Sequence, residues 1–279
     1  MTPMSTAFDR CADRIAAADS LVICAGAGMG VDSGLPDFRG PGGFWRVYPA
    51  LARARMQFEE IANPAAFERE PQLAWGFYGH RLALYRATRP HAGFAILNAI
   101  ADRLPYGAFV FTSNVDGQFQ VGGTPSERVL ECHGSIHHLQ CAAVCSDDIW
   151  PADFEPHIDA DACRMLGELP SCPRCGGLAR PNVLMFSDWN WIAQRTETQR
   201  HRMHDWLHRV ARPLVIELGA GTHVPTVRMT AEHLGAPILR INPGEPQLPA
   251  ERGVSLALGA LEALAGIETA LQRRGFFAP

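Results

Sequence analysis

The chain reads Leu21-Val-Ile-Cys-Ala-Gly-Ala-Gly-Met-Gly-Val-Asp-Ser-Gly-Leu-Pro-Asp-Phe-Arg-Gly40, where a short apolar segment runs into closely spaced glycines. The apolar residues 21–25 predict a buried strand, and Gly26, Ala27 and Gly28 follow it directly. Such a turn lets the backbone approach a pyrophosphate, whose charge is met by helix N-terminal amides. A tight turn in any α/β protein would leave the same local pattern. No acidic residue closes a second strand about twenty residues later, so the ordinary dehydrogenase fingerprint is absent.

Further apolar runs follow along the chain, each closed by glycine or by a polar loop. Continuous apolar runs of this length suit strands that are buried on both faces of a parallel sheet. Helical stretches lie between them, and this alternation predicts a doubly wound α/β fold, in which ligands bind beyond the carboxyl ends of the strands. The expected strands span residues 21–25, 108–112, 128–132, 213–218 and 237–241, and the expected helices span 8–18, 64–88, 91–104, 196–210, 226–234 and 260–274.

Two stretches interrupt the alternation. Residues 41–86 read as a loop followed by helix that is rich in aromatic side chains, and residues 139–180 hold five of the eight cysteines. The second stretch therefore reads as a small inserted module.

Four of these cysteines fall into two close pairs, Cys141 with Cys145 and Cys172 with Cys175. Four thiolates give the tetrahedral set of a closed, structural zinc site, and the Cys-Pro-x-Cys-Gly pattern of the second pair is typical of a zinc knuckle. Because the first pair has one residue more than the usual C-x2-C, Cys163 or His138 could replace one ligand. We assign the metal no catalytic role.

Polar residues follow two other expected strands. Ser113, Asn114 and Asp116 come directly after residues 108–112, where an amide and a carboxylate could hold a ribose, a nicotinamide amide or a water. Turn-forming residues would give the same pattern. His133 follows the strand at 128–132, where it could act as a general base near pH 7 or have a structural role.

The composition excludes several kinds of protein. All 25 basic residues are arginine, so the chain has no lysine for a phosphate-binding loop, a Schiff base or a kinase site. A net charge of −4 gives no general attraction to nucleic acid or to membranes. The apolar runs are too short for a membrane span, and the N-terminal segment does not resemble a signal peptide. We therefore expect a cytoplasmic protein whose cysteines serve as metal ligands or thiols.

Taken together and in this order, the motifs resemble those of the sirtuins, the NAD-dependent protein lysine deacylases. The family signature joins a G-A-G loop and S-G-[IV]-P-D-F-R-G to T-Q-N-[IV]-D, H-G, four cysteines, R-P-x-V-x-x-F and a late I-N. The resemblance covers residues 20–265. The matching residues are Gly26–Gly28, Ser33–Gly40, Thr112, Asn114–Asp116, His133–Gly134, the four cysteines, Arg180–Phe186 and Ile241–Asn242.

The resemblance implies a Rossmann-like domain that binds NAD, beside a smaller zinc-binding and helical domain. The expected large domain comprises residues 1–40, 87–138 and 181–279, with the cofactor loop and helical part at 41–86 and the zinc module at 139–180. NAD and an acyl-lysine protein or peptide would enter between the domains. The acyl group would pass to ADP-ribose with release of nicotinamide, and within this chain no lysine could serve as substrate.

The resemblance also implies residue roles. His133 would deprotonate a ribose hydroxyl, and Asn114 and Asp116 would shape the nicotinamide pocket as catalytic residues. Further cofactor contacts are implied for Gly26, Ala27, Gly28, Asp37, Phe38, Arg39, Ser113, Gly219, Asn242 and the backbone near Leu258. Val183 and Phe186, in the R-P-x-V-x-x-F motif, would bind the substrate.

The chain departs from the family pattern at several positions. Gly30 replaces the usual serine, Ser113 a glutamine and Phe119 a histidine. The family's F-G-E is Phe186-Ser-Asp188 here, beside the strand that clamps the substrate peptide in the family, and its G-T-S-L is Gly219-Ala-Gly-Thr222. The changes at Gly30 and Ser113 would remove two ribose or phosphate contacts, and the segment at 219–222 belongs to the cofactor side. The loss of the F-G-E pattern bears on peptide recognition and leaves the NAD half largely in place.

A local similarity concerns the acyl group. The segment containing Trp75-Gly-Phe-Tyr78-Gly-His-Arg81 is similar to the branch that removes succinyl and malonyl groups. Tyr78 and Arg81, three apart on a helix, share a face, and an arginine fork suits a carboxylate. A packed Tyr78 with a solvated Arg81 would leave acyl specificity undetermined.

We predict a zinc-containing, NAD-dependent sirtuin deacylase. The first alternative uses the same NAD site for NAD hydrolysis or ADP-ribosyl transfer, for which an altered peptide clamp would not matter. The second is a non-catalytic sensor of NAD or ADP-ribose, against which the intact Asn114, Asp116 and His133 argue.

Overall fold

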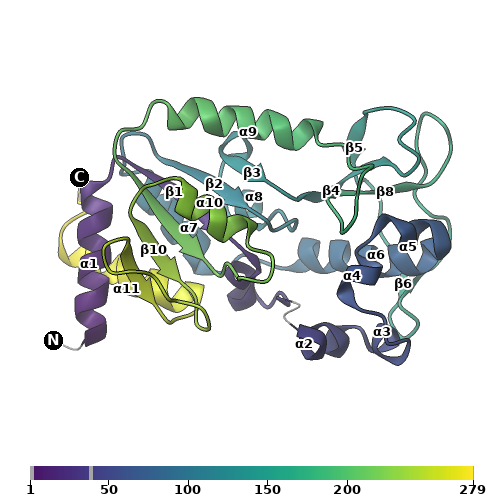
Figure 1. Cartoon of the computed structure of the whole chain (residues 1–279), viewed down its shortest axis with the longest axis horizontal. Helices are drawn as coiled ribbons and strands as arrows, with labels where there is room; N and C mark the ends of the chain where they lie inside the picture. Colours follow the sequence, from purple (N-terminus) through teal and green to yellow (C-terminus); the bar gives the residue numbers. More distant parts are fainter. Residues whose placement is uncertain (1–2, 38–39, 279) are drawn as a thin grey trace.

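The computed structural model describes residues 3–37 and 40–278, and a six-stranded sheet lies at its centre (Figure 1). The strand order is β11-β10-β9-β1-β2-β3, and every neighbouring pair is parallel. The predicted α/β fold is confirmed, and each expected strand is present. The strands are β1 (Ser20–Ala25), β2 (Ala108–Thr112), β3 (Val129–Glu131), β9 (Pro213–Leu218), β10 (Ile238–Ile241) and β11 (Gly253–Leu256).

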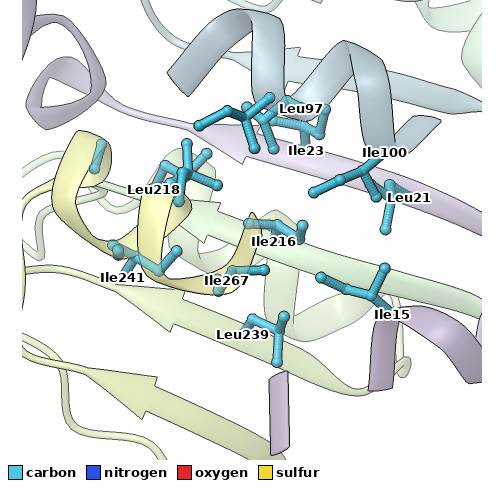
Figure 2. Close-up of a cluster of buried hydrophobic side chains, with 14 of the residues drawn as sticks. Ile15, Leu21, Ile23, Leu97, Ile100, Ile216, Leu218, Leu239, Ile241 and Ile267 are labelled. Carbon is cyan, nitrogen blue, oxygen red and sulfur yellow. The ribbon is translucent and has the colours of Figure 1, made fainter. Parts of the chain in front are cut away.

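Helices cover both faces of the sheet, which explains why its strands consist mainly of apolar residues. One face packs against α1 (Pro3–Ala17), α7 (Ala92–Ala101) and α11 (Ala260–Arg273), and the other against α9 (Gln194–Leu207) and α10 (Thr226–His233). Figure 2 shows the first contact, with Leu97 and Ile100 of α7 over Ile23 and Leu21 of β1. Val22 and Cys24 point to the opposite face.

A second lobe lies beside the carboxyl edge of the sheet (Figure 1). Its own apolar core joins helices from residues 40–87 to an antiparallel sheet of order β5-β4-β8. The helices are α2 (Gly40–Val47), α3 (Pro49–Arg53), α4 (Phe58–Ile61), α5 (Pro64–Arg69) and α6 (Pro71–Ala87); the strands are β4 (Gly134–Cys141), β5 (Ile149–Pro151), β8 (Ala179–Val183) and the pair β6 (Ile158–Asp159) and β7 (Arg164–Met165). Short segments complete the chain: η1 (Ala27–Ser33), α8 (Gln118–Val121) and η2 (Ser126–Arg128).

Two local expectations were wrong. The single helix expected over residues 64–88 is two helices, because Glu70 has the extended φ of −139° and Pro71 begins α6 without a backbone N–H to continue α5. The loop expected from residue 41 contains α2, α3 and α4, which are too short to show a helical period. The four-residue edge strand β11 was also missed.

Candidate functional site

Glycines bring the loops after β1 and β9 into backbone contact. The Gly28 N–H donates to the Gly219 carbonyl at 3.2 Å, and a Cβ on Gly28 would lie 2.6 Å from the Gly219 Cα. A Cβ on Gly26 would meet the Gly219 oxygen at 2.8 Å. From β1, the chain adds β2 and β3 on one side of the sheet and then β9, β10 and β11 on the other. The strand order therefore reverses between β1 and β9. Such a switch point is where doubly wound sheets bind nucleotides.

The loop after β2 joins the same place. The Asn114 Nδ2 donates to the Gly26 carbonyl at 3.1 Å, while the Thr112 hydroxyl accepts from the Asn114 N–H at 3.0 Å. The Ser113 N–H donates to the carbonyl of Ala25, the last residue of β1, at 3.2 Å. The structure therefore places Asn114 directly against the glycine loop.

Asp116 is a buried carboxylate, with 7% of its surface exposed. Burial raises the pKa of Asp116 to about 6, although the Gln118 N–H, which donates to Oδ1 at 2.9 Å, opposes the shift. The His137 side chain binds the backbone of the same residue, since its Nε2 lies 2.8 Å from the Asp116 carbonyl oxygen. With a pKa of about 6, this carboxyl is mostly ionised at pH 7 and accepts hydrogen bonds, and it takes up a proton a little below neutral pH.

His133 follows β3 and lies half-buried beside the β2 loop. Burial lowers the pKa of His133, and a hydrogen bond with the backbone of Ser113 opposes that shift. The imidazole is therefore neutral at pH 7 and has a nitrogen lone pair available to accept a proton. The Leu184 N–H donates to the His133 carbonyl at 2.9 Å, so His133 is also tied to the segment after β8.

The structure describes only some of the residues that were expected to contact the adenosine or to form the cofactor loop. The Asn242 side chain is fully buried and bonds to backbone, donating to the Ala220 carbonyl at 2.8 Å and accepting from the Gly244 and Glu245 N–H groups at 3.0 Å. Its side chain thus shapes the loop after β10. The expected contact residues Phe38 and Arg39 lie outside the described residues. Ala27 is exposed, and Asp37 and Leu258 are half-buried.

Tyr78 and Arg81 lie together on α6, and both are buried. The Arg81 guanidinium carbon lies 5.7 Å from the Tyr78 ring centre, and similar contacts reach Phe77 and Tyr85 at 5.2 and 5.4 Å. Its Nε donates to the Tyr85 hydroxyl at 3.0 Å. Arg81 is therefore not solvated, in contrast to the alternative in which Tyr78 packs and Arg81 faces the solvent.

Gln118 connects this aromatic cluster to Asp116. Its Nε2 donates to the carbonyls of Tyr85 and Thr88 at 3.3 and 3.2 Å, while its backbone N–H binds Asp116. The Arg81 charge also contributes a lowering effect on the Asp116 pKa. Hydrogen bonds through Tyr85 and Gln118 therefore connect Arg81 to Asp116.

The expected substrate residues lie on the segment that leaves β8. Val183 pairs with Gly134 across the β4–β8 ladder, directly after His133. The Phe186 N–H donates to the Ala62 carbonyl at 2.9 Å, and its ring contacts Phe58 edge-on at 5.9 Å.

The four cysteines meet in one cluster, with all sulfur atoms within 4.8 Å of one another. Sulfur atoms lie 3.7 Å apart in the pair Cys141–Cys175 and 3.5 Å apart in Cys145–Cys172. A tetrahedral zinc ion with bonds of about 2.3 Å would separate its sulfur ligands by about 3.8 Å, so this donor set fits zinc. Neither Cys163 nor His138 belongs to the cluster.

The sequence analysis did not identify two ion pairs that lie beside the recognised motifs. Asp188 binds Arg180 through two contacts of 2.8 and 2.9 Å and also accepts the Met185 N–H, which fixes the segment after β8. Glu131, two residues before His133, pairs with Arg195 of α9. The acids at 131 and 188 are visible beside recognised motifs, but nothing local identifies their partners.

Comparisons with known proteins agree with this geometry. The family model described as "Sir2 family" matches residues 26–211. A Pyrobaculum aerophilum protein named "NAD-dependent protein deacylase 2" is 33% identical over 83% of this chain and 82% of its own length. A Danio rerio protein named "NAD-dependent protein deacylase sirtuin-5, mitochondrial" is 33% identical over 67% of this chain and 63% of its own length.

Solved structures agree as well. A "Sir2 homolog-NAD complex" superimposes with a TM-score of 0.72 at 25% identity and covers 95% of this chain and 93% of that one. A Sir2 homologue bound to ADP ribose gives a TM-score of 0.71 at 26% identity, with 95% and 96% covered. The resemblance inferred from the motifs is therefore confirmed, and the chain belongs to the Sir2 family.

Proposed function

We propose that this chain is an NAD-dependent protein deacylase that prefers acyl groups ending in a carboxylate, such as succinyl and malonyl. The observation that carries the proposal is the continuous site from the glycine loops through Asn114, Asp116 and Gln118 to Arg81. Relatives named NAD-dependent protein deacylase, among them a sirtuin-5, support the same reaction class.

The residues of the chain divide the work as follows. NAD, when bound, supplies a ribose carbon that loses nicotinamide and accepts the acyl oxygen. The backbone amides of the loops after β1 and β9 would hold its phosphates, and Asn114 and Asp116 would orient the nicotinamide. A ring nitrogen of the neutral His133 imidazole would accept the proton of a ribose hydroxyl.

The acyl group enters beside α6. Its terminal carboxylate would pair with the Arg81 guanidinium, since a fork of N–H donors buried among aromatic rings favours a planar anion over a methyl group. Tyr78 would contact the acyl group beside Arg81 and offer its hydroxyl as a further hydrogen-bond donor. The acyl-lysine backbone lies along Val183 to Phe186, and the substrate is a separate protein or peptide.

The remaining expectations also stand as proposals. We assign the NAD-binding domain to residues 1–40, 87–138 and 181–279, and the smaller domain to residues 41–86 and 139–180. Within the described residues, no helix has the length and apolar character of a membrane span. A cytoplasmic location is our proposal from the free cysteines and the sequence.

The test incubates purified protein with NAD and matched peptides that carry acetyl-, malonyl- or succinyl-lysine. We expect nicotinamide release that depends on the acyl peptide and is fastest with the acidic acyl groups. Release without peptide would support NAD hydrolysis instead, and no release from any mixture would support a non-catalytic sensor.

A further inference from the structure

Two histidines on the exposed side of α9 bring their ring nitrogens together. His204 lies in the last turn of α9, and His208 caps the helix four residues later. The two Nε2 atoms are 3.0 Å apart, and the rings are nearly perpendicular at 80°. Residues four apart on a helix lie on the same face, so the helix itself sets this approach.

This spacing matches the requirement of a metal ion. A metal–imidazole bond is about 2.0–2.1 Å long, so two such ligands are about 2.9 Å apart at a right angle and about 3.4 Å apart in a tetrahedron. The observed 3.0 Å lies in this range. The same spacing suits a hydrogen bond between the rings, and a metal replaces that shared proton once the donor ring carries its proton on Nδ1.

The carboxylate of Asp205 lies near the His204 ring. The Asp205 Oδ1 lies 3.8 Å from the Nδ1 of His204, on the side away from the paired Nε2 atoms. This separation is longer than a hydrogen bond, so Asp205 acts as a nearby negative charge that favours a proton on Nδ1, and carboxylates commonly lie on this side of metal-binding histidines. The pair is also open to solvent, since 68% of the His204 side-chain surface is exposed.

We propose that His204 and His208 form a second metal site, distinct from the cysteine cluster. It takes a borderline divalent ion such as Cu²⁺ or Ni²⁺, with the two Nε2 atoms as ligands and water in the remaining positions. Imidazole suits these ions, and Cu²⁺ binds most tightly in the divalent series. The cysteine cluster offers four thiolates and is closed, whereas this site keeps exchangeable positions.

The test uses the zinc-loaded protein. Cu²⁺ is titrated by calorimetry, and the electron paramagnetic resonance spectrum of the complex is recorded. We expect one Cu²⁺ per chain with coupling to two nitrogens. Because each remaining imidazole would act alone, His204→Ala and His208→Ala should each weaken Cu²⁺ binding by about 100-fold.

The matched control is His233→Ala, which removes an exposed histidine of α10 and should leave Cu²⁺ binding unchanged. A second readout is the melting temperature, which Ni²⁺ should raise in wild type and in His233→Ala but not in His204→Ala. Unchanged Cu²⁺ affinity in both α9 variants would overturn the proposal. A spectrum with sulfur coordination and release of zinc would overturn it as well.

Discussion

Asp116→Asn measures what the site gives up in stability to keep a buried carboxylate. Asp116 is 7% exposed, and burial raises its pKa from 3.8 to about 6. The amide of asparagine has nearly the same shape, and its oxygen can still accept the Gln118 N–H that Asp116 Oδ1 accepts at 2.9 Å. The substitution therefore removes the buried charge and leaves the neighbouring contacts in place.

The magnitude follows from proton linkage. A folded-state pKa of about 6, against 3.8 when unfolded, corresponds to about 3 kcal/mol of stability. Because the folded pKa is raised, this stability is present when Asp116 is protonated below about pH 4 and is lost as the pH rises through about 6. Wild type therefore carries the penalty above pH 6, whereas Asp116→Asn does not.

The assay is urea unfolding followed by tryptophan fluorescence, at pH values from about 4 to 8 with zinc present. We expect Asp116→Asn to exceed wild type by up to about 3 kcal/mol near pH 8, with an advantage that disappears toward pH 4. Asp102→Asn, at an exposed position, is the matched control and should show no such dependence. A constant advantage at every pH, or a variant less stable than wild type near pH 8, would refute the reasoning. The stabilised variant should also lose deacylation, as expected when a site carries strain for function.

Three further predictions concern other parts of the molecule. Removing zinc with a chelator should lower the melting temperature, because four clustered thiolates would then repel one another or require protons; an unchanged melting curve would argue against a structural metal. Asp188→Ala should lower the free energy of unfolding by about 3–5 kcal/mol in a urea titration, since it leaves the buried Arg180 unpaired, whereas a loss below about 1 kcal/mol would contradict that pairing. Arg81→Met should raise KM for succinyl peptides at least about 10-fold while leaving acetyl peptides little changed; equal losses for both would indicate a purely structural Arg81.

The sheet and its ligand edge could be predicted from the sequence because strands buried on both faces consist mainly of apolar residues. β1 and β2, for example, are unbroken apolar runs that end in glycines or in polar residues such as Ser113. The four expected zinc ligands could also be predicted from the sequence, because cysteine pairs at short spacing are a local signal. The structure brings these four together and leaves out Cys163 and His138.

Other features could not be read from local sequence. Glu131 meets Arg195 across 64 residues, and Gln118 reaches Tyr85 across 33, so both contacts depend on the tertiary fold. The contact between Gly28 and Gly219 likewise joins two loops whose glycines each looked like ordinary turn residues. The break between α5 and α6 was visible as Pro71 but was outweighed by the apolar pattern on both sides.

The most direct test of the proposed deacylase activity is nicotinamide release from NAD, measured with and without a succinyl-lysine peptide. We predict release that requires the peptide, matches the amount of deacylated peptide, and falls by at least about 100-fold in His133→Ala, because the general base is lost. Equal release with and without peptide, or deacylation retained in full by His133→Ala, would contradict the assignment.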